Sequence, residues 1–187
     1  SSFKIYALSA GGGTLALSAQ MGRDGNYAHD LAILNNWGPD LVISMTESQE
    51  LGDVDMAQDI SPAQWIHFPV QDYGVPSEKR TSEWNTVADT AIKTLMVGGR
   101  VLIHCRGGCG RSGMAVLRLM IGSGEPADVA LTRLRALRPC AVETQAQMEW
   151  AFSDSTSKDE HGCGPSNQNW MRDYDPTLGR YLQADPL

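Results

Sequence analysis

Residues 101–114 read Val-Leu-Ile-His-Cys-Arg-Gly-Gly-Cys-Gly-Arg-Ser-Gly-Met. The stretch opens with apolar β-forming residues, passes through a glycine-rich segment and ends where a long apolar run begins. A short apolar run bounded by turn residues predicts a buried strand, and the apolar run after it predicts a buried helix over residues 112–121. The stretch therefore predicts a strand–loop–helix unit. In open α/β sheets such a loop, at the carboxyl end of a strand, is where ligands bind.

The same alternation of strand and helix continues on both sides of this unit. Further strands are expected at residues 3–8, 14–18, 41–45 and 65–70, and further helices at residues 26–37, 81–97, 126–137 and 144–152. This order predicts an α/β fold with a mostly parallel central sheet flanked by helices. From about Asp154 the composition becomes rich in Ser, Asp, Lys, Gly and Asn. We therefore expect one domain over residues 1–153 and a C-terminal extension over residues 154–187.

Charge is unevenly distributed along the 187 residues. The chain has a formal net charge of -7, which argues against binding to nucleic acid or to an anionic membrane surface. Residues 100–138, however, hold seven arginines against only Glu125 and Asp128. On charge alone this segment is equally well explained by a solvated basic face or by an anion-binding site.

The residues of the glycine-rich segment favour the anion site. Gly107, Gly108 and Gly110 allow the backbone to curl closely around a small oxyanion, with the following helix N-terminus adding positive charge. Cys105 would sit at the mouth of this nest, where that positive charge favours the thiolate and makes it a nucleophile. Arg111 follows six residues later and can return across the loop to grip two oxyanion oxygens. A thiolate in such a nest is suited to attack on phosphorus.

The four cysteines are too scattered for a disulfide framework, and neither they nor the four histidines have the spacing of a metal site. The apolar segment Tyr6–Ala19 is interrupted by Gly11, Gly12 and Gly13, which predicts strands around a turn rather than a signal peptide. No apolar run is long enough to span a membrane. We therefore expect a cytoplasmic protein with free thiols, no metal and no cofactor.

The segment His104-Cys-Arg-Gly-Gly-Cys-Gly-Arg-Ser112 resembles the His-Cys-five residues-Arg-Ser signature of the cysteine-dependent protein tyrosine and dual-specificity phosphatases. Its Gly-Gly-x-Gly-Arg-Ser form looks most like the compact branch related to cyclin-dependent-kinase inhibitor 3. The resemblance extends to residues 42–47, 69–76 and 138–147, and so covers residues 1–152.

This resemblance implies a two-step reaction. Cys105 attacks phosphorus while an acid protonates the leaving oxygen, and water then hydrolyses the cysteinyl-phosphate. Arg111 and the loop Arg106-Gly107-Gly108-Cys109-Gly110 would bind the phosphate oxygens. Asp72 is the expected acid, because it follows an apolar strand, lies 33 residues before Cys105 and matches the family's acid loop. Its alternative reading is an aspartate in a turn beside Gly74, in which case Glu78 is the reserve acid.

The remaining roles rest on the family resemblance. Ser112 is expected to hydrogen-bond the departing thiolate, or to cap the helix, or to do both. His104 is expected to orient the loop and favour the thiolate, and Gln147 to position the hydrolytic water. Cys109 replaces a commoner apolar residue of the loop. It is read either as a partner that traps oxidised Cys105 in a disulfide or as a small apolar filler.

We expect a phosphorylated protein or peptide as substrate, with phosphotyrosine preferred to phosphoserine and phosphothreonine. Phosphoinositide phosphatases tend to carry extra lysines in this loop, whereas here Arg106 is the additional base. A phosphoinositide or other small phosphomonoester is therefore the alternative substrate. A sulfurtransferase is a weaker alternative, because it would need neither Asp72 nor the Arg-Ser ending. A catalytically silent phosphate-binding module would lack Cys105, Arg111 or Asp72.

Residues 172–187 resemble the closing hallmark of Rhs/YD-repeat proteins. A fragment of this length cannot form that architecture, so we expect a remnant without its own core or activity. Four apolar residues of the extension are expected to pack on the domain or on a neighbouring chain: Trp170, Tyr174, Tyr181 and Leu182.

Overall fold

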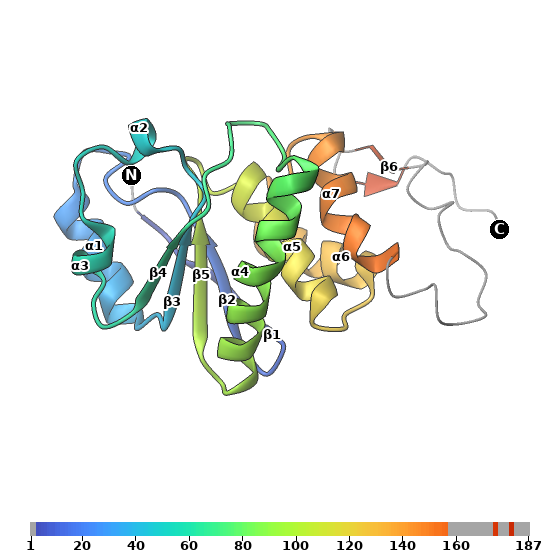
Figure 1. Ribbon diagram of the computed structural model, residues 1–187, viewed down its shortest axis with the longest axis horizontal. Helices are drawn as coiled ribbons and strands as arrows, with labels where there is room; N and C mark the ends of the chain where they lie inside the picture. The colour runs from blue at the N-terminus through green and yellow to red at the C-terminus, as the bar shows by residue number, and fades with distance from the viewer. Residues whose placement is uncertain (1–2, 157–173, 176–179, 182–187) are drawn as a thin grey trace.

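The computed structural model describes residues 3–156, 174–175 and 180–181. A five-stranded sheet forms its centre, in the order β1-β2-β5-β3-β4 (Figure 1). Its strands are β1 (Tyr6–Ala10), β2 (Gly13–Ser18), β3 (Leu41–Ser44), β4 (Gln64–His67) and β5 (Arg100–His104). Strand β1 pairs antiparallel with β2, and all other neighbours pair parallel. The predicted α/β fold with a mostly parallel sheet is confirmed.

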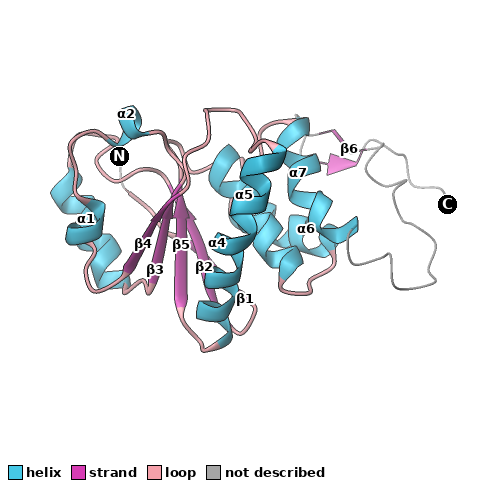
Figure 2. Cartoon of the chain, viewed as in Figure 1, coloured by secondary structure: helices cyan, strands magenta, loops and turns pink. Residues whose placement is uncertain are grey.

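Helices cover both faces of this sheet (Figure 2). They are α1 (Tyr27–Trp37), α2 (Ser48–Leu51), α3 (Met56–Asp59), α4 (Glu78–Met96), α5 (Gly110–Gly122), α6 (Ala127–Leu137) and α7 (Gln145–Thr156). The short helices α2 and α3 were not predicted, because four residues are too few for a helical period to show.

Alternate residues of the central strands build two separate cores. Leu15, Ile43 and Ile103 belong to the larger core, which also takes in buried residues of α4, α5, α6 and α7. Their neighbours Val42 and Leu102 point to the other face, where they join buried residues of α1 and α3. Because a strand buried on both faces needs apolar residues at every position, these strands appear in the sequence as continuous apolar runs.

Capping explains where α4 begins. The sequence predicts this helix from Thr81, whereas it begins at Glu78 because the Ser77 hydroxyl accepts a hydrogen bond from the N–H of Arg80 at 3.2 Å. At the other end the helix reaches Met96, and Gly98 follows with φ 82. The polar first turn has no apolar period, so the sequence pattern found only the part of the helix that packs on the sheet.

Three parallel strands end at the same edge of the sheet, and this edge positions the candidate site. His104 of β5 is paired with Ser44 of β3, which in turn is paired with His67 of β4. The segments that follow carry Cys105, helix α2 and the loop with Asp72, so residues far apart in sequence converge there. This is the edge at which parallel sheets bind ligands.

Most of the predicted extension, including Trp170 and Leu182, lies outside the described residues. Within it, β6 (Tyr174–Asp175) and β7 (Arg180–Tyr181) form an antiparallel pair. The likeness of residues 172–187 to the Rhs/YD-repeat hallmark stays a prediction. In the described part of the chain, no helix has the length and apolar character needed to cross a membrane.

Candidate active site

The loop between β5 and α5 has its carbonyl groups occupied and its N–H groups open. The carbonyl oxygens of residues 105–109 all accept hydrogen bonds, from His104, Gln20, Arg138 and the N–H groups of Val142 and Gly113. Within the described chain, the backbone N–H groups of residues 106–111 donate no hydrogen bond. Six open donors in one tight loop at a helix N-terminus form a nest for an anion.

Close packing against β2 shapes this loop. Gly108 has φ 72, a conformation that L side chains rarely adopt. A Cβ atom on Gly108 would lie 2.6 Å from the backbone N of Ala19 and 2.6 Å from the carbonyl carbon of Ser18. Glycine is therefore required at this position by the contact with the end of β2, whereas the sequence had suggested glycine for wrapping around an oxyanion.

Cys105 lies inside the loop and is only 3% exposed. Its Sγ is 3.2 Å from the Oγ of Ser112, close enough for a hydrogen bond between the thiol and the hydroxyl. Helix α5 begins at Gly110, and Cys109 occupies the N-cap position. Ser112 therefore lies inside the first turn, and the alternative that it caps the helix is wrong. Its hydroxyl faces the sulfur instead.

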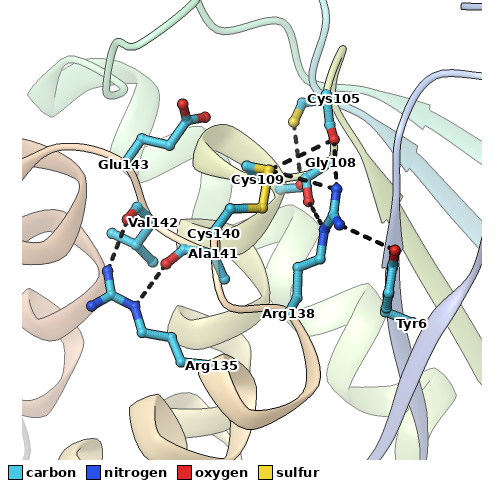
Figure 3. The surroundings of a disulfide bond; sticks show 12 residues. Tyr6, Cys105, Gly108, Cys109, Arg135, Arg138, Cys140, Ala141, Val142 and Glu143 are labelled. Atoms are coloured by element: carbon cyan, nitrogen blue, oxygen red, sulfur yellow. Dashed lines mark hydrogen bonds between the residues drawn. A yellow bond between two sulfur atoms is a disulfide. The ribbon is translucent and has the colours of Figure 1, made fainter. Parts of the chain in front are cut away.

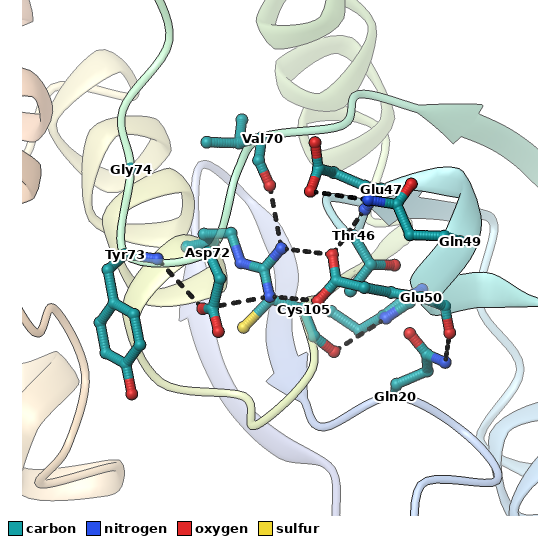
Figure 4. Close-up of polar contacts among 12 residues, drawn as sticks. Gln20, Thr46, Glu47, Gln49, Glu50, Val70, Asp72, Tyr73, Gly74 and Cys105 are labelled. Carbon is teal, nitrogen blue, oxygen red and sulfur yellow. Dashed lines mark hydrogen bonds and ion pairs between the residues drawn. The ribbon is translucent and has the colours of Figure 1, made fainter.

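The Arg111 guanidinium is held by helix α2 and by the loop that follows β4, through the Glu50, Val70 and Asp72 groups labelled in Figure 4. Its Nη1 donates to Glu50 Oε2 at 2.8 Å and to the Val70 carbonyl at 2.9 Å, and its Nη2 donates to Glu50 Oε1 at 2.9 Å. Nη2 also lies 3.3 Å from Asp72 Oδ1. The Nε of Arg111 is buried and has no hydrogen-bond partner among the described residues. A buried cation with one open donor suits an anionic ligand.

Charge pairing shifts the pKa values of both partners. The hydrogen bond from Arg111 holds the pKa of Glu50 below its usual range, although partial burial acts in the opposite direction. Burial of Arg111 acts to lower the pKa of the guanidinium, but the hydrogen bond to Glu50 and the nearby charges of Cys105 and Asp72 outweigh burial and raise it. The guanidinium therefore stays charged at the candidate site.

Asp72 lies in the loop after β4, with its side chain 54% exposed. One oxygen, Oδ1, accepts the N–H of Tyr73 at 3.0 Å and faces Arg111. Glu78, the reserve acid of the sequence analysis, is the exposed first residue of α4 and forms no ion pair within the described chain. The contact with Arg111 thus places Asp72, rather than Glu78, against the nest.

His104 is fully buried and directly precedes Cys105. Ser44 Oγ lies 2.5 Å from Nε2 of His104, and His104 Nδ1 lies 3.2 Å from the Cys105 carbonyl oxygen. Trp65 Nε1 donates to Ser44 Oγ at 2.9 Å, so the Ser44 hydroxyl is left to donate to Nε2, and Nδ1–H donates to the carbonyl. Burial lowers the pKa of His104 to about 4. A neutral histidine therefore fixes the backbone at Cys105.

Gln147 joins the Asp72 loop to the far side of the nest. This residue of α7 is completely buried. Its Oε1 accepts the N–H groups of Glu143 and Thr144, and its Nε2 donates to the carbonyl of Gly74 at 3.3 Å. A Cβ on Gly110 would lie 2.9 Å from this Oε1. The amide thus lies at the edge of the nest, in contact with the loop that carries Asp72.

The structure corrects the expectation that the thiols are free. Cys109 forms a disulfide with Cys140, 31 residues later in the chain (Figure 3). Cys109 is therefore neither a free partner for oxidised Cys105 nor a simple apolar filler. The pair forms because the segment before α7 folds back onto the loop, bringing the two Cα atoms within 5.2 Å. Cys105 is the free cysteine of the described residues.

The sequence analysis missed Glu50 and Arg138 as site residues. Glu50 was not singled out from the sequence, and Arg138 was noted only among the seven arginines of residues 100–138 and within the stretch 138–147 that resembles the family. A weak signal for Glu50 was present, since Glu47 and Glu50 have the spacing of a capping box and form a capping box: the N–H of Glu47 donates to Glu50 Oε2 at 2.7 Å.

In the described chain, no three His, Cys, Asp or Glu residues cluster as metal ligands.

Comparison with protein-family models identifies the domain. The model described as "Swiss Army Knife protein, DSP-PTPase phosphatase domain" matches residues 18–150, which hold the sheet edge, the nest and Asp72. The chain belongs to this family. Most of its DSP-PTPase domain therefore lies within the part of the chain that the structure describes.

Solved structures show the same fold as this DSP-PTPase domain. Tk-PTP in its active form is 28% identical, with a TM-score of 0.64 over 84% of this chain and 98% of Tk-PTP. Kinase associated phosphatase (KAP), solved with its catalytic-site cysteine replaced by serine, is 22% identical, with a TM-score of 0.72 over 87% of this chain and 99% of KAP.

One curated relative is viral. Protein 067L of Invertebrate iridescent virus 3, whose name describes it provisionally as a tyrosine phosphatase, is 26% identical over 99 residues. The match spans 50% of this chain and 41% of the relative, so this DSP-PTPase chain corresponds to less than half of that protein.

Proposed function

We propose that this protein hydrolyses phosphomonoesters on phosphorylated proteins or peptides through a cysteinyl-phosphate intermediate. One observation carries the proposal: the open N–H groups of residues 106–111 and the unpartnered Nε of Arg111 surround the buried thiol of Cys105. These donors suit the oxygens of a phosphoryl group, and the sulfur lies within the same loop. Phosphoryl transfer depends chiefly on such positioning and charge stabilisation.

In the first step the Cys105 thiolate attacks phosphorus, and the bond from phosphorus to the ester oxygen breaks. Arg111 and the loop N–H groups stabilise the equatorial oxygens, so positive charge is supplied by the protein. Asp72, whose carboxyl group lies beside Arg111, delivers a proton to the leaving oxygen. When phosphate occupies the nest, Nη2 of Arg111 exchanges its contact with Asp72 for a phosphate oxygen.

In the second step water attacks the cysteinyl-phosphate, Asp72 accepts a proton from the water, and the thiolate leaves. The hydroxyl of Ser112 stabilises the departing sulfur, from which it lies 3.2 Å. Gln147 supports the water's position, because its amide lies at the nest and also holds the Asp72 loop through Gly74. His104, neutral and buried, keeps the loop in register and takes no part in proton transfer.

Tyr73 supports phosphotyrosine as the preferred substrate. It follows Asp72 directly, is 62% exposed, and has φ 60, a left-handed conformation that costs a non-glycine residue free energy. Figure 4 shows its side chain on the same loop as Asp72, extending to one side of the Asp72 carboxylate. An exposed aromatic ring held there is placed to stack on an aryl phosphate. Phosphoserine and phosphothreonine peptides, and phosphoinositides, are the competing substrates.

The experiment is hydrolysis of a small aryl phosphate in the presence of a metal chelator. We expect activity in the wild type, none in Cys105→Ser, and a large loss in Asp72→Ala. Activity that needs added metal, or that survives Cys105→Ser, would overturn the proposal. Phosphotyrosine and phosphoserine peptides of one sequence, together with phosphoinositide micelles, then rank the substrates. Tyr73→Ala should reduce activity on the phosphotyrosine peptide more than on the phosphoserine peptide.

A further inference from the structure

We propose that the Cys109–Cys140 disulfide is a reversible modification site that positions the phosphate-binding loop. In its disulfide form the loop binds oxyanions more tightly than after reduction. The proposal rests on the proposed function only in taking the loop as an oxyanion site. Nothing in the reaction itself requires Cys140, which lies outside the nest.

Arg138 shows how the outer side of the loop is held (Figure 3). Its Nε donates to the Gly108 carbonyl and its Nη2 to the Gly107 carbonyl, both at 3.1 Å. Its Nη1 donates to the Tyr6 hydroxyl at 3.1 Å, and its guanidinium carbon lies over the Tyr6 ring, 4.4 Å from the ring centroid. Because the carbonyls are held outward, the N–H groups of the same peptides face the nest.

The disulfide lies on this same outer side. Cys109 Sγ is 3.7 Å from the Gly107 carbonyl oxygen and 3.6 Å from Arg138 Nη2. Cys140 follows Arg138 by two residues, so the covalent bond and the arginine tie one short segment to one loop. The thiol of Cys105, in contrast, contacts Ser112 within the nest. The two sulfur sites therefore serve different sides of the loop.

Backbone strain near the Cys109–Cys140 bond explains why breaking this bond would move the loop. Val142 has φ 66, a genuine outlier for a β-branched residue. It is held by its own N–H, which donates to the Cys109 carbonyl at 3.1 Å, and by Arg135, whose Nη2 donates to the Val142 carbonyl at 2.8 Å. Such a conformation persists only when its surroundings over-determine it. Removing the covalent bond two residues away gives the segment a way to relax and to carry the loop with it.

The disulfide is open to attack from one side. Cys140 is an exposed residue, whereas Cys109 is partly buried. A thiolate of a dithiol reductant attacks Cys140 Sγ, the S–S bond breaks, and Cys109 leaves as a thiolate that takes up a proton. The second thiol of the reductant then displaces Cys140 and closes a disulfide within the reductant. The protein gains two electrons and two protons, and the reductant loses them.

The active form of the site therefore needs cysteines in two different oxidation states. Cys105 must be reduced to act as a nucleophile. Cys109 and Cys140 must be oxidised to hold the loop in its binding geometry. The disulfide also keeps Cys109 occupied, so Cys109 is not available to oxidised Cys105.

The test measures oxyanion affinity, which does not depend on turnover. Tungstate binding to the full chain is measured by calorimetry for the disulfide form and after treatment with dithiothreitol, with the free thiols counted in each sample. Reduction should raise the tungstate Kd about fivefold, the size of effect expected when one loop hydrogen bond loses its alignment. Cys140→Ser should show the same raised Kd with or without the reductant.

Two variants separate positioning from general damage. Arg138→Gln should raise the tungstate Kd further in the reduced protein, since both supports of the loop are then lost. Thr132→Ser, on the exposed side of α6, leaves the loop untouched and should still respond to reductant like the wild type. Equal tungstate affinity in the disulfide and reduced forms would overturn the proposal. Free thiols at Cys109 and Cys140 in the protein before reduction would overturn it as well. If tungstate binds as expected but no phosphate ester is hydrolysed, the proposed function fails and this inference stands.

Discussion

The carboxylate of Glu50 accepts hydrogen bonds from both terminal nitrogens of Arg111, at 2.8 and 2.9 Å, although the two residues are 61 positions apart. The Arg111 side chain is 1% exposed and that of Glu50 is 15% exposed. The paired geometry fixes the plane of the guanidinium and leaves Nε open. Glu50 is thus a positioning residue, since it acts on the phosphate site through Arg111.

Replacement of Glu50 by glutamine should weaken oxyanion binding. Glutamine keeps the size of the side chain but removes the charge and one acceptor, so Arg111 loses one of its paired hydrogen bonds. We expect kcat/KM to fall about tenfold, because a hydrogen bond to a charged group contributes about 1.5–3 kcal/mol and part of it is retained. Steady-state kinetics and tungstate titration measure the effect.

Glu47→Gln is the matched control for this change. Glu47 belongs to the same capping box but accepts from Gln49 rather than from Arg111. Both variants perturb the start of α2, whereas only Glu50→Gln perturbs the guanidinium. Equal losses of oxyanion affinity in the two variants would show that the helix, and not the ion pair, is what matters.

Asp72→Asn should remove the proton donor while keeping the shape of the loop. We expect kcat to fall about 10²–10⁴-fold, the usual range for loss of general acid–base catalysis. The loss should be larger for a phosphoserine peptide than for a nitrophenyl phosphate, because a nitrophenolate leaves without needing a proton. Comparison of the two leaving groups therefore reports on proton donation itself.

Two further variants serve as controls for Asp72→Asn. Asp89→Asn makes the same chemical change at an exposed position of α4 and should have no effect on kcat. Glu78→Gln tests the reserve acid and should cost less than about twofold, whereas a general acid contributes about a hundredfold or more. A large loss in Glu78→Gln together with an active Asp72→Asn would assign the acid to Glu78.

Features that depend on residues close together in the sequence could be predicted, whereas features that depend on contacts between distant segments could not. The strands and the spacing of Cys105 and Arg111 could be predicted because each depends on neighbouring residues: a buried strand needs a continuous apolar run, and the nest needs glycines within one loop. The start of α5 was misplaced by two residues, since Gly110 and Arg111 do not look like a helical turn until the loop positions them.

The missed features all depend on segments that meet only after folding. Glu50 sits on a four-residue helix without an apolar period, so nothing in its neighbourhood indicated Arg111 as its partner. The Cys109–Cys140 bond required the segment before α7 to fold back onto the loop, and cysteine spacing alone does not determine which cysteines pair. Arg138 reaches the loop by the same fold-back.

His104 should make folding stability depend on pH. Its pKa is lowered by burial from the ordinary 6.5 to about 4, so the unfolded chain binds a proton at a higher pH than the native protein does. Its contribution to the free energy of unfolding is complete above the unfolded value and is lost as the pH falls from there toward the folded value. Over that window the loss is about 3 kcal/mol.

Urea denaturation of the wild type and of His104→Asn across this pH window measures the contribution. Asparagine does not titrate, so the difference in unfolding free energy between the two proteins should shrink as the pH falls. Other groups, including Glu50, titrate in both proteins and cancel in the difference. If His104→Asn does not fold, Ser44→Ala, which removes the hydrogen bond to Nε2, should shift the same pH dependence. Parallel pH profiles for the wild type and His104→Asn would contradict the assigned pKa.

Removal of residues 157–187 should leave catalysis intact. The sheet, the nest, Asp72 and all of α7 lie before this point, and α7 contributes the buried residues Met148, Ala151 and Phe152 to the larger core. We expect kcat/KM of the shortened chain to stay within about twofold of the full chain, because the site keeps its described contacts. A cut after Thr144 is the contrasting variant: it removes α7, exposes the larger core and should leave the chain unfolded. A shortened chain that ends at Thr156, shows a cooperative thermal transition and yet is inactive would show instead that the extension takes part in the site.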